Sequence, residues 1–150
     1  MMQENFDTII AFAIEREKEA VAFYIDLQGK TNFFAQKEML KELESMERGH
    51  ITILEDIKKR GFGNITSKEV KDLHISDYIV PEEPGKILTY QDIMIIAMKR
   101  EEASRDLYAD LAKRFDGTET GTLFARLSAE EAEHKLRFER IYDEEVLKNN

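Results

Sequence analysis

The sequence predicts an all-α protein in which four long helices form a bundle of two antiparallel hairpins joined by a long crossover. Apolar residues recur at three- and four-residue steps over four segments, and this spacing is typical of one face of an α-helix. Short breaks separate the helices within each pair, whereas both prolines lie in the long segment between the pairs. Antiparallel neighbours need only short connections, so the long segment indicates a crossover rather than an up-and-down bundle.

The first hairpin is expected over about residues 7–60. Its first helix spans about residues 7–29, with a capping residue expected at Asn5 or Asp7. Its second helix spans about residues 33–60 and is followed directly by a glycine. Glycine is common just after a helix because it adopts the left-handed backbone conformation at little cost.

The crossover is expected over about residues 61–88. It contains the sequence GFGN and both prolines, which oppose a long regular helix. A short helical turn is expected within it at about residues 68–73. This segment would take the chain back along the bundle to the start of the second hairpin.

The second hairpin is expected over about residues 89–147. Thr89 and Asp92 have the spacing of a capping box, with Asp in the place of the usual Glu, and they predict a helix to about Phe115. The sequence DGTETG then interrupts the apolar pattern. The last helix is predicted over about residues 118–147.

The composition favours a soluble helical protein and excludes several kinds of function. With 42% hydrophobic and 35% charged residues, the chain (1–150) is expected to form one domain with a single core. A net charge of −9 argues against nucleic-acid and anionic-membrane partners, because both require a basic surface. No long apolar segment or leader pattern is apparent, so a cytoplasmic protein is expected. Since cysteine is absent, any metal must be held by oxygen and nitrogen.

The two hairpins repeat one another at a fixed offset of 84 positions. The repeated residues are Glu17 and Glu101, Tyr24 and Tyr108, Glu47 and Glu131, and His50 and His134. Aligning residues 13–27 with residues 97–111 also gives six identities. One Glu-x-x-His is a common accident, but two copies in the same register, each with an upstream glutamate, are not. The repeat therefore predicts that both hairpins bring similar side chains to one site.

The repeated glutamates and histidines have the composition of a site for two metal ions. Residues three apart lie on one helix face, so the Glu and His of each Glu-x-x-His motif can bind the same ion. With the upstream glutamates, the predicted ligands are Glu17, Glu47, His50, Glu101, Glu131 and His134. Four ionised glutamates balance two divalent ions, and neutral imidazoles add no charge. Carboxylate and imidazole ligands suit iron or manganese, and zinc is possible.

Both histidines fall on apolar stripes, which favours burial over a solvated surface pair. These stripes contain Leu43, Met46, Ile53 and Leu54 around the first histidine, and Leu127, Leu136 and Phe138 around the second. Either Glu-x-x-His motif alone would more often be part of a solvated helix face. The shared register of the two motifs is what favours a metal site.

Other residues near these motifs have alternative interpretations. Glu44 and Glu130 neighbour the predicted ligands and compete for the same roles, but the three-residue spacing to histidine favours the set above. Tyr24 and Tyr108 lie about two turns after the upstream glutamates. Each could hydrogen-bond a ligand carboxylate or simply fill the core. His74 has no matched partner and is expected at the surface.

These motifs resemble those of the rubrerythrins, the di-iron peroxidase branch of the ferritin-like superfamily. The resemblance rests on E-x-x-A-x-x-F-Y from Glu17 to Tyr24, its counterpart E-x-x-S-x-x-L-Y from Glu101 to Tyr108, and the two E-x-x-H motifs. It implies a ferritin-like four-helix bundle that holds two iron ions on the six predicted ligands. The two tyrosines would then lie beside those ligands and assist catalysis.

The resemblance also implies an oxidoreductase that reduces hydrogen peroxide and protects against oxidative stress. Rubrerythrins usually contain a rubredoxin domain with Cys-x-x-Cys pairs, whereas this sequence has no cysteine. An external electron donor such as a rubredoxin is therefore expected. Rubrerythrins often have a further ligand glutamate at the position of Ser104, which leaves open whether iron moves between ligands here. A homodimer is expected, because ferritin-like bundles often dimerise.

Two other functions stay open from the sequence. One is a ferroxidase or iron-binding protein that consumes dioxygen or peroxide while it sequesters iron. The other is a non-enzymatic helical bundle in which a metal is structural or absent. Reaction rates with peroxide and dioxygen distinguish the first from a peroxidase, and metal analysis tests the second.

Overall fold

The four predicted helices are present in the computed structural model, which describes residues 6–60, 73–80 and 89–148. The elements are α1 (Phe6–Lys30), α2 (Phe34–Arg60), the short 3₁₀ helix η1 (Ile75–Tyr78), α3 (Tyr90–Arg114) and α4 (Glu119–Lys148). No β-strand occurs in these described ranges. The all-α prediction is confirmed, and the predicted helix ends lie within a few residues of the observed ones.

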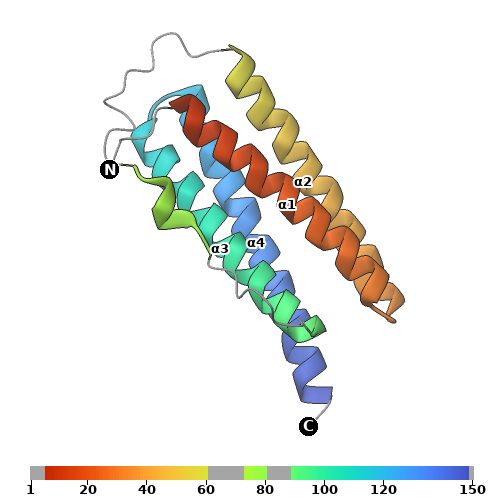
Figure 1. Ribbon diagram of the computed structural model, residues 1–150. Helices are drawn as coiled ribbons and strands as arrows, with labels where there is room; N and C mark the ends of the chain where they lie inside the picture. The colour runs from red at the N-terminus through yellow and green to blue at the C-terminus, as the bar shows by residue number, and fades with distance from the viewer. Residues whose placement is uncertain (1–5, 61–72, 81–88, 149–150) are drawn as a thin grey trace.

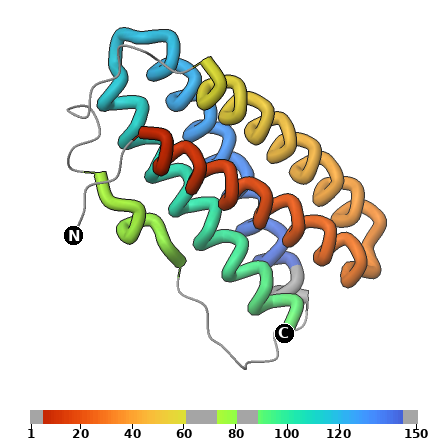
Figure 2. Tube along the Cα trace, turned by 45° about the horizontal axis from the view of Figure 1, so that its top comes forward, coloured from red at the N-terminus to blue at the C-terminus, as the bar shows by residue number. Residues whose placement is uncertain are grey.

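The helices form two antiparallel hairpins that pack side by side (Figure 1). α1 packs against α2 and α3 packs against α4, while α1 also contacts α3 and α2 contacts α4. α2 ends at one end of the bundle and α3 begins near the other end, as Figure 2 also shows. The chain between them therefore has to traverse the length of the bundle. This confirms the long crossover, which is the connectivity of ferritin-like bundles.

The capping box predicted at the start of α3 is present. The Thr89 side-chain oxygen accepts a hydrogen bond from the Asp92 N–H, and the Asp92 carboxylate accepts one from the Thr89 N–H, each at 3.1 Å. These bonds satisfy two backbone donors that the helix itself leaves without acceptors. At the start of α1 the helix already begins at Phe6, so Asp7 lies in its first turn and is not the capping residue. The other candidate, Asn5, lies outside the described residues.

The helical turn expected at about residues 68–73 lies almost wholly outside the described residues, and Leu73 itself is not helical. The described part of the crossover contains η1 instead, which packs against α3. The buried Tyr78 of η1 donates a hydrogen bond of 2.5 Å to the Asp110 carboxylate of α3. This contact attaches the crossover to the second hairpin.

A tight turn joins α3 to α4. Gly117 has a φ of +82°, a conformation that glycine adopts without the steric cost other residues incur. The Thr118 hydroxyl then accepts a hydrogen bond of 3.0 Å from the Gly121 N–H, as a residue that caps a helix does. α4 therefore begins one residue later than predicted, because Thr118 precedes the helix rather than opening it.

Apolar side chains fill the bundle in two clusters. The first includes Ile9, Ile10, Ile14, Leu54, Leu107, Leu111, Phe124 and Leu127. The second includes Tyr24, Leu27, Leu40, Leu43, Met94, Ala97, Phe138 and Ile141. On every one of the four helices, the predicted metal ligands lie between the residues of the two clusters. The ligands therefore form a polar layer near the middle of the bundle.

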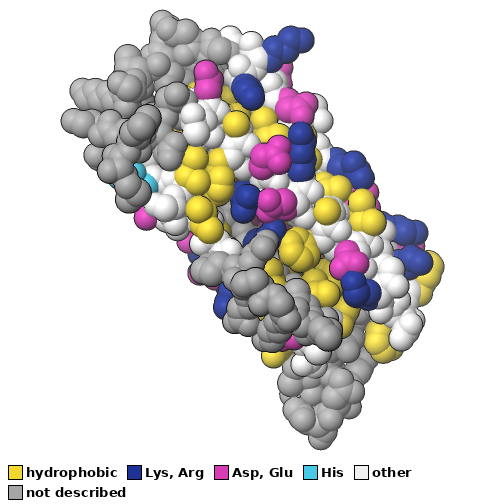
Figure 3. All heavy atoms as spheres, viewed as in Figure 1, with side chains coloured by type: hydrophobic (Ala, Val, Ile, Leu, Met, Phe, Trp, Pro, Cys, Tyr) yellow, Lys and Arg dark blue, Asp and Glu magenta, His cyan; other side chains and the backbone are white. Residues whose placement is uncertain are grey.

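Charged residues lie on the outside of the bundle, with some hydrophobic side chains between them. Figure 3 shows acidic and basic side chains interspersed on the face seen in Figure 1. Leu136, which was expected on the stripe of His134, is 53% exposed. Two residues along an α-helix correspond to a rotation of about 200°, so Leu136 points away from the side on which His134 is buried. None of the described helices has an apolar stretch long enough to cross a membrane.

Candidate metal centre

The six predicted ligands meet in the middle of the bundle. α1 contributes Glu17, α2 contributes Glu47 and His50, α3 contributes Glu101, and α4 contributes Glu131 and His134. Each of these side chains is at most 3% exposed. Charged groups are almost never buried to this extent unless they are paired or bind a metal.

The six residues form two overlapping sets of possible ligands. One set is Glu17, Glu47, His50 and Glu131, and the other is Glu47, Glu101, Glu131 and His134. Within each set, one ligand atom from every residue lies within 4.8 Å of the others. Glu47 and Glu131 belong to both sets. The arrangement therefore suits two ions that share two carboxylates.

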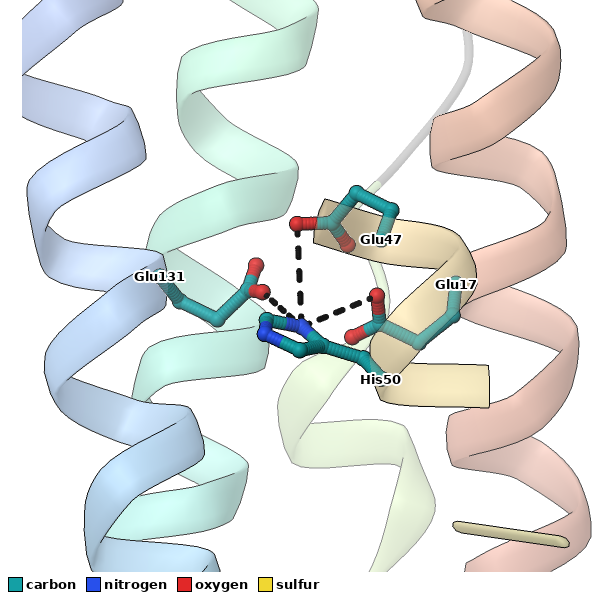
Figure 4. Close-up of side chains that lie close together, drawn as sticks. All are labelled: Glu17, Glu47, His50 and Glu131. Atoms are coloured by element: carbon teal, nitrogen blue, oxygen red, sulfur yellow. Dashed lines mark ion pairs between the residues drawn. The ribbon is translucent and has the colours of Figure 1, made fainter. Parts of the chain in front are cut away.

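His50 directs its Nδ1 atom into the first set (Figure 4). This atom lies 2.8 Å from the Glu131 carboxylate, 3.5 Å from Glu17 and 3.7 Å from Glu47. The shortest contact is thus to a glutamate of the other hairpin. A His50 side chain placed by α2 is therefore held against α4 as well as against its own helix.

His134 makes the matching contacts in the second set. Its Nδ1 atom lies 2.7 Å from the Glu47 carboxylate, 3.6 Å from Glu101 and 3.9 Å from Glu131. The two imidazole rings are nearly parallel, with centroids 6.0 Å apart and an interplanar angle of 12°. The sequence repeat thus appears in space as a pseudo-twofold relation between the hairpins.

Two tyrosines hydrogen-bond the outer glutamates of the cluster. The Tyr108 hydroxyl donates to the Glu17 carboxylate at 2.6 Å, and the Tyr24 hydroxyl donates to the Glu101 carboxylate. Both hydroxyls are buried with their partners. Of the two sequence interpretations, contact with a ligand carboxylate is therefore the one found, but each tyrosine bonds the glutamate of the opposite hairpin.

The buried charges change the proton affinities of the cluster. Burial and the charge of Glu47 raise the pKa of Glu17 well above its usual value. Burial and the charges of the neighbouring glutamates likewise raise the pKa of Glu131. Burial opposes ionisation of Glu47 too, but close polar contacts with Glu17 and His134 outweigh it and lower the pKa of Glu47 to about 2. Without metal, these shifts favour the protonated forms of Glu17 and Glu131 and the ionised form of Glu47.

Burial and the neighbouring carboxylates also shift the pKa values of His134 and Tyr108. Burial alone would lower the pKa of His134, but the Glu101 and Glu47 carboxylates outweigh burial and raise this pKa to about 10. Burial and the charge of Glu17 raise the pKa of Tyr108, so its hydroxyl stays protonated and remains a donor.

The cluster suits bound metal in its residue composition. It also suits metal because several of its buried polar atoms lack hydrogen-bond partners. Besides Nε2 of His134, six buried atoms of the cluster lie close to one another but have no partner in good hydrogen-bond geometry within the described part of the chain: Oε2 of Glu17, Oε1 of Glu47, Nδ1 of His50, Oε2 of Glu101, Oε1 of Glu131 and Nδ1 of His134. One such atom comes from every predicted ligand. Buried polar atoms without partners are costly, and metal coordination is the interaction that would satisfy all six.

One contact of the centre was not predicted. The Glu130 carboxylate lies 2.7 Å from Nε2 of His50, the ring nitrogen that faces away from the cluster. The sequence indicates Glu130 only as a rival ligand, because a contact between α4 and α2 leaves no trace in local spacing. The other rival, Glu44, instead bonds Gln28 and Arg48, each at 2.9 Å. His74 is half-buried beside η1, away from the two ligand sets.

A small cavity lies beside the cluster between α1 and α3. It is lined by Glu101, Ser104 and Ala20, among others, and it has room of about 20 Å³ for water-sized molecules. A space of about 10–15 Å³ by this measure is enough for one water molecule. Ala20 and Ser104 are themselves 84 positions apart, and each follows an outer glutamate by three residues. Small side chains at these matched positions leave the space open.

Two arginines, Arg16 and Arg100, border the same cavity. They are again 84 positions apart, and each donates a hydrogen bond of 2.8 Å to Glu19. Arg16 also lies over the Phe12 ring, 4.9 Å from its centroid, and Arg100 lies over the Phe23 ring at 4.6 Å. These contacts hold both guanidinium groups at the side of the cavity.

A four-helix bundle with two overlapping carboxylate and histidine sets defines the class of proteins that hold two metal ions in a helical core. The model of the Rubrerythrin family matches residues 8–142 of this chain. The protein therefore belongs to the rubrerythrin family. Comparison with curated proteins and with solved structures gave no significant match.

Proposed function

We propose that this rubrerythrin-family protein is a di-iron oxidoreductase that reduces hydrogen peroxide with electrons from an external donor. The observation that supports this most directly is the pair of ligand sets sharing Glu47 and Glu131 inside the core. Shared carboxylates would hold two ions next to one another, so that both could act on one substrate. Oxygen and imidazole ligands without thiolate favour iron or manganese, and membership of the family favours iron.

When bound, a pair of ferrous ions supplies the two electrons that cleave the O–O bond of hydrogen peroxide. Two protons are taken up and two water molecules form. The external donor, for which a rubredoxin is the expected class, returns the two electrons. None of the 150 residues is a cysteine, so these residues could not hold a thiolate-bound relay iron.

The residues of the chain hold the ligands in place and manage protons. Tyr108 and Tyr24 donate to Glu17 and Glu101, which limits the orientations these carboxylates can adopt. Metal ligands must be deprotonated, so loading of the centre releases the protons that Glu17 and the shared Glu131 hold in the metal-free protein. The neutral form of each imidazole leaves the charge balance to the four glutamates.

The cavity at Glu101 and Ser104 is the route by which a small oxidant would reach the cluster. Its size suits hydrogen peroxide, which is little larger than water. The oxidant would pass between the small side chains of Ala20 and Ser104. Larger substrates would be excluded, because the cluster itself is almost completely buried.

The proposal is tested by anaerobic reconstitution with ferrous iron followed by stopped-flow mixing. We expect two iron ions per chain and oxidation by hydrogen peroxide that is much faster than oxidation by dioxygen. Turnover should require an added rubredoxin and its reductase. A stoichiometry below one ion would rule out the dinuclear centre. Dioxygen matching peroxide in rate would instead favour the ferroxidase or iron-binding function.

A further inference from the structure

The two histidines of the centre differ in the contacts of Nε2, the ring nitrogen that faces away from the cluster. Nε2 of His50 lies 2.7 Å from the Glu130 carboxylate. Nε2 of His134 is buried and has no hydrogen-bond partner among the described residues. The position 84 residues before Glu130 is Met46, whose thioether is at best a weak acceptor. The repeat therefore does not extend to this pair of positions.

The other ring nitrogen, Nδ1, faces the cluster in both histidines and has similar surroundings in each. Nδ1 of His50 lies 2.8, 3.5 and 3.7 Å from three carboxylates, and Nδ1 of His134 lies 2.7, 3.6 and 3.9 Å from its three. Two of the three glutamates are the same in both cases. The inner sides of the two ligand sets are thus nearly equal, and the outer nitrogen is the main difference between them.

A metal bound to Nδ1 requires the imidazole proton to be on Nε2. A carboxylate that accepts this proton fixes the required tautomer, orients the ring and makes Nδ1 a stronger ligand. Glu130 is placed to do this for His50. It is three-quarters buried and is itself held by Arg126, whose Nε lies 3.5 Å away. Among the described residues the His134 ring has no such acceptor, so its buried N–H would lack a partner there when Nδ1 binds metal.

We propose that the two ligand sets have unequal metal affinity, that the set containing His50 fills first, and that Glu130 is the positioning residue that makes it the tighter site. This inference rests on the metal binding proposed above. Loss of such a hydrogen-bonded partner typically lowers metal affinity by about 10–100-fold. The centre would therefore pass through a state with one ion, held by Glu17, Glu47, His50 and Glu131.

The location of the first ion tests the proposal. Two dications repel one another, so even equal sites would give two separate binding steps, and the titration curve alone does not decide. Crystals of the full chain loaded anaerobically with one equivalent of ferrous iron should show anomalous scattering at His50 and little at His134. Equal scattering at both positions, or scattering mainly at His134, would overturn the inference.

Variants at the matched positions give a second test, by anaerobic calorimetric titration with ferrous iron. Glu130→Leu should weaken the first binding step by about 10–100-fold, and Glu130→Gln should weaken it less, since the amide oxygen still accepts a hydrogen bond. Met46→Glu should tighten the second step, while Met46→Leu is the matched control and should change neither. An unchanged first step in Glu130→Leu would refute the role of Glu130. Failure of the wild type to bind iron at all would instead refute the dinuclear centre.

Discussion

The α1–α3 side and the α2–α4 side of the centre follow the sequence repeat to different extents. On the α1–α3 side the matched glutamates and tyrosines make equivalent contacts, although the matched arginines both bond Glu19. On the α2–α4 side the ligands match, but Glu130 faces His50 while Met46 stands at the equivalent position. The repeat is thus more faithful among the residues that would bind metal than among the residues that contact those ligands from outside. Differences between the two ions should therefore arise on the α2–α4 side.

The largest effect should come from the shared carboxylates of the α2–α4 side. Glu131→Gln should reduce iron binding to below one ion per chain, because Glu131 belongs to both ligand sets. Glu17→Gln on the α1–α3 side should affect one set and leave about one ion. Glu133→Gln, an exposed neighbour of the ligands, is the control and should retain two. Elemental analysis after anaerobic reconstitution measures all three, and equal losses at Glu131 and Glu17 would contradict the shared role.

The effect of Glu131→Gln on stability should differ between the iron-loaded and the metal-free protein. Without metal, burial and the neighbouring carboxylates oppose ionisation of Glu131, so Glu131→Gln should leave the free energy of unfolding unchanged or higher. With iron bound, the variant should be less stable than the wild type because stabilisation by bound ligand is lost. Denaturant unfolding with and without iron makes the comparison. Equal destabilisation of both forms would mean that Glu131 is an ordinary structural residue.

The metal-free protein should lose stability as the pH rises. The folded-state pKa of His134 is about 10, against a usual value of 6.5. Its contribution is therefore complete below about pH 6.5 and is lost as the pH rises through about 10. Glu17 and Glu131 act in the same direction, because their raised pKa values give a contribution that is present below 4.5 and lost at higher pH. Glu47 acts oppositely, but only as the pH falls from 4.5 through about 2.

Denaturant unfolding at pH 6.5 and pH 9.5 measures this dependence. The metal-free protein should have the higher free energy of unfolding at pH 6.5. The iron-loaded protein should show a smaller difference between these two values, because its ligands are already deprotonated. His134→Gln should reduce the dependence in the metal-free form. The same pH dependence in loaded and metal-free protein would show that the cluster does not bind metal through these groups.

On the α1–α3 side, enlarging the cavity residues should slow the oxidant without removing metal. Ser104→Leu and its matched change Ala20→Leu should each lower the rate of oxidation by peroxide in stopped flow, with two ions still bound. Ala22→Leu, an exposed position on α1, serves as the control. Ser104→Glu tests a different point, since an added carboxylate beside Glu101 should alter the rate of reoxidation. Unchanged rates in both leucine variants would place the entrance elsewhere.

The sequence predicted which glutamates and histidines come together in the core, because two physical periodicities coincide on them. Helical spacing placed Glu47 beside His50, and the 84-residue repeat required a second copy at Glu131 and His134, so no knowledge of packing was needed. The capping box at Thr89 and Asp92 was predictable for the same reason, since it depends on residues three apart. The four helices followed from their apolar spacing and from the prolines between the pairs.

Features that depend on how the helices pack could not be predicted in this way. The contact between Glu130 and His50 joins α4 to α2 and has no matched copy to indicate it. The tyrosines were expected near a carboxylate, but spacing along one helix could not show that Tyr24 bonds Glu101 across the hairpins. The cavity depends on the absence of side-chain volume at Ala20 and Ser104, and its existence is decided by the distance between α1 and α3.

The smallest expected effect concerns those crossed tyrosine bonds. Tyr24→Phe and Tyr108→Phe each remove one hydroxyl that donates to a buried carboxylate. Loss of a buried hydrogen bond of this kind costs about 1–3 kcal/mol, and we expect each variant of the iron-loaded protein to lose about that much. Because the two bonds are related by the repeat, the two losses should be similar, in contrast to the unequal effects expected behind the histidines. Tyr142→Phe, at a partly exposed position on α4, controls for removal of a hydroxyl away from the cluster. Denaturant unfolding of the iron-loaded variants measures the losses. The stability losses of Tyr24→Phe and Tyr108→Phe could instead differ as strongly as Glu130→Leu and Met46→Leu differ in iron affinity. That result would extend the asymmetry to the α1–α3 side, and the contrast between the two sides of the centre would no longer hold.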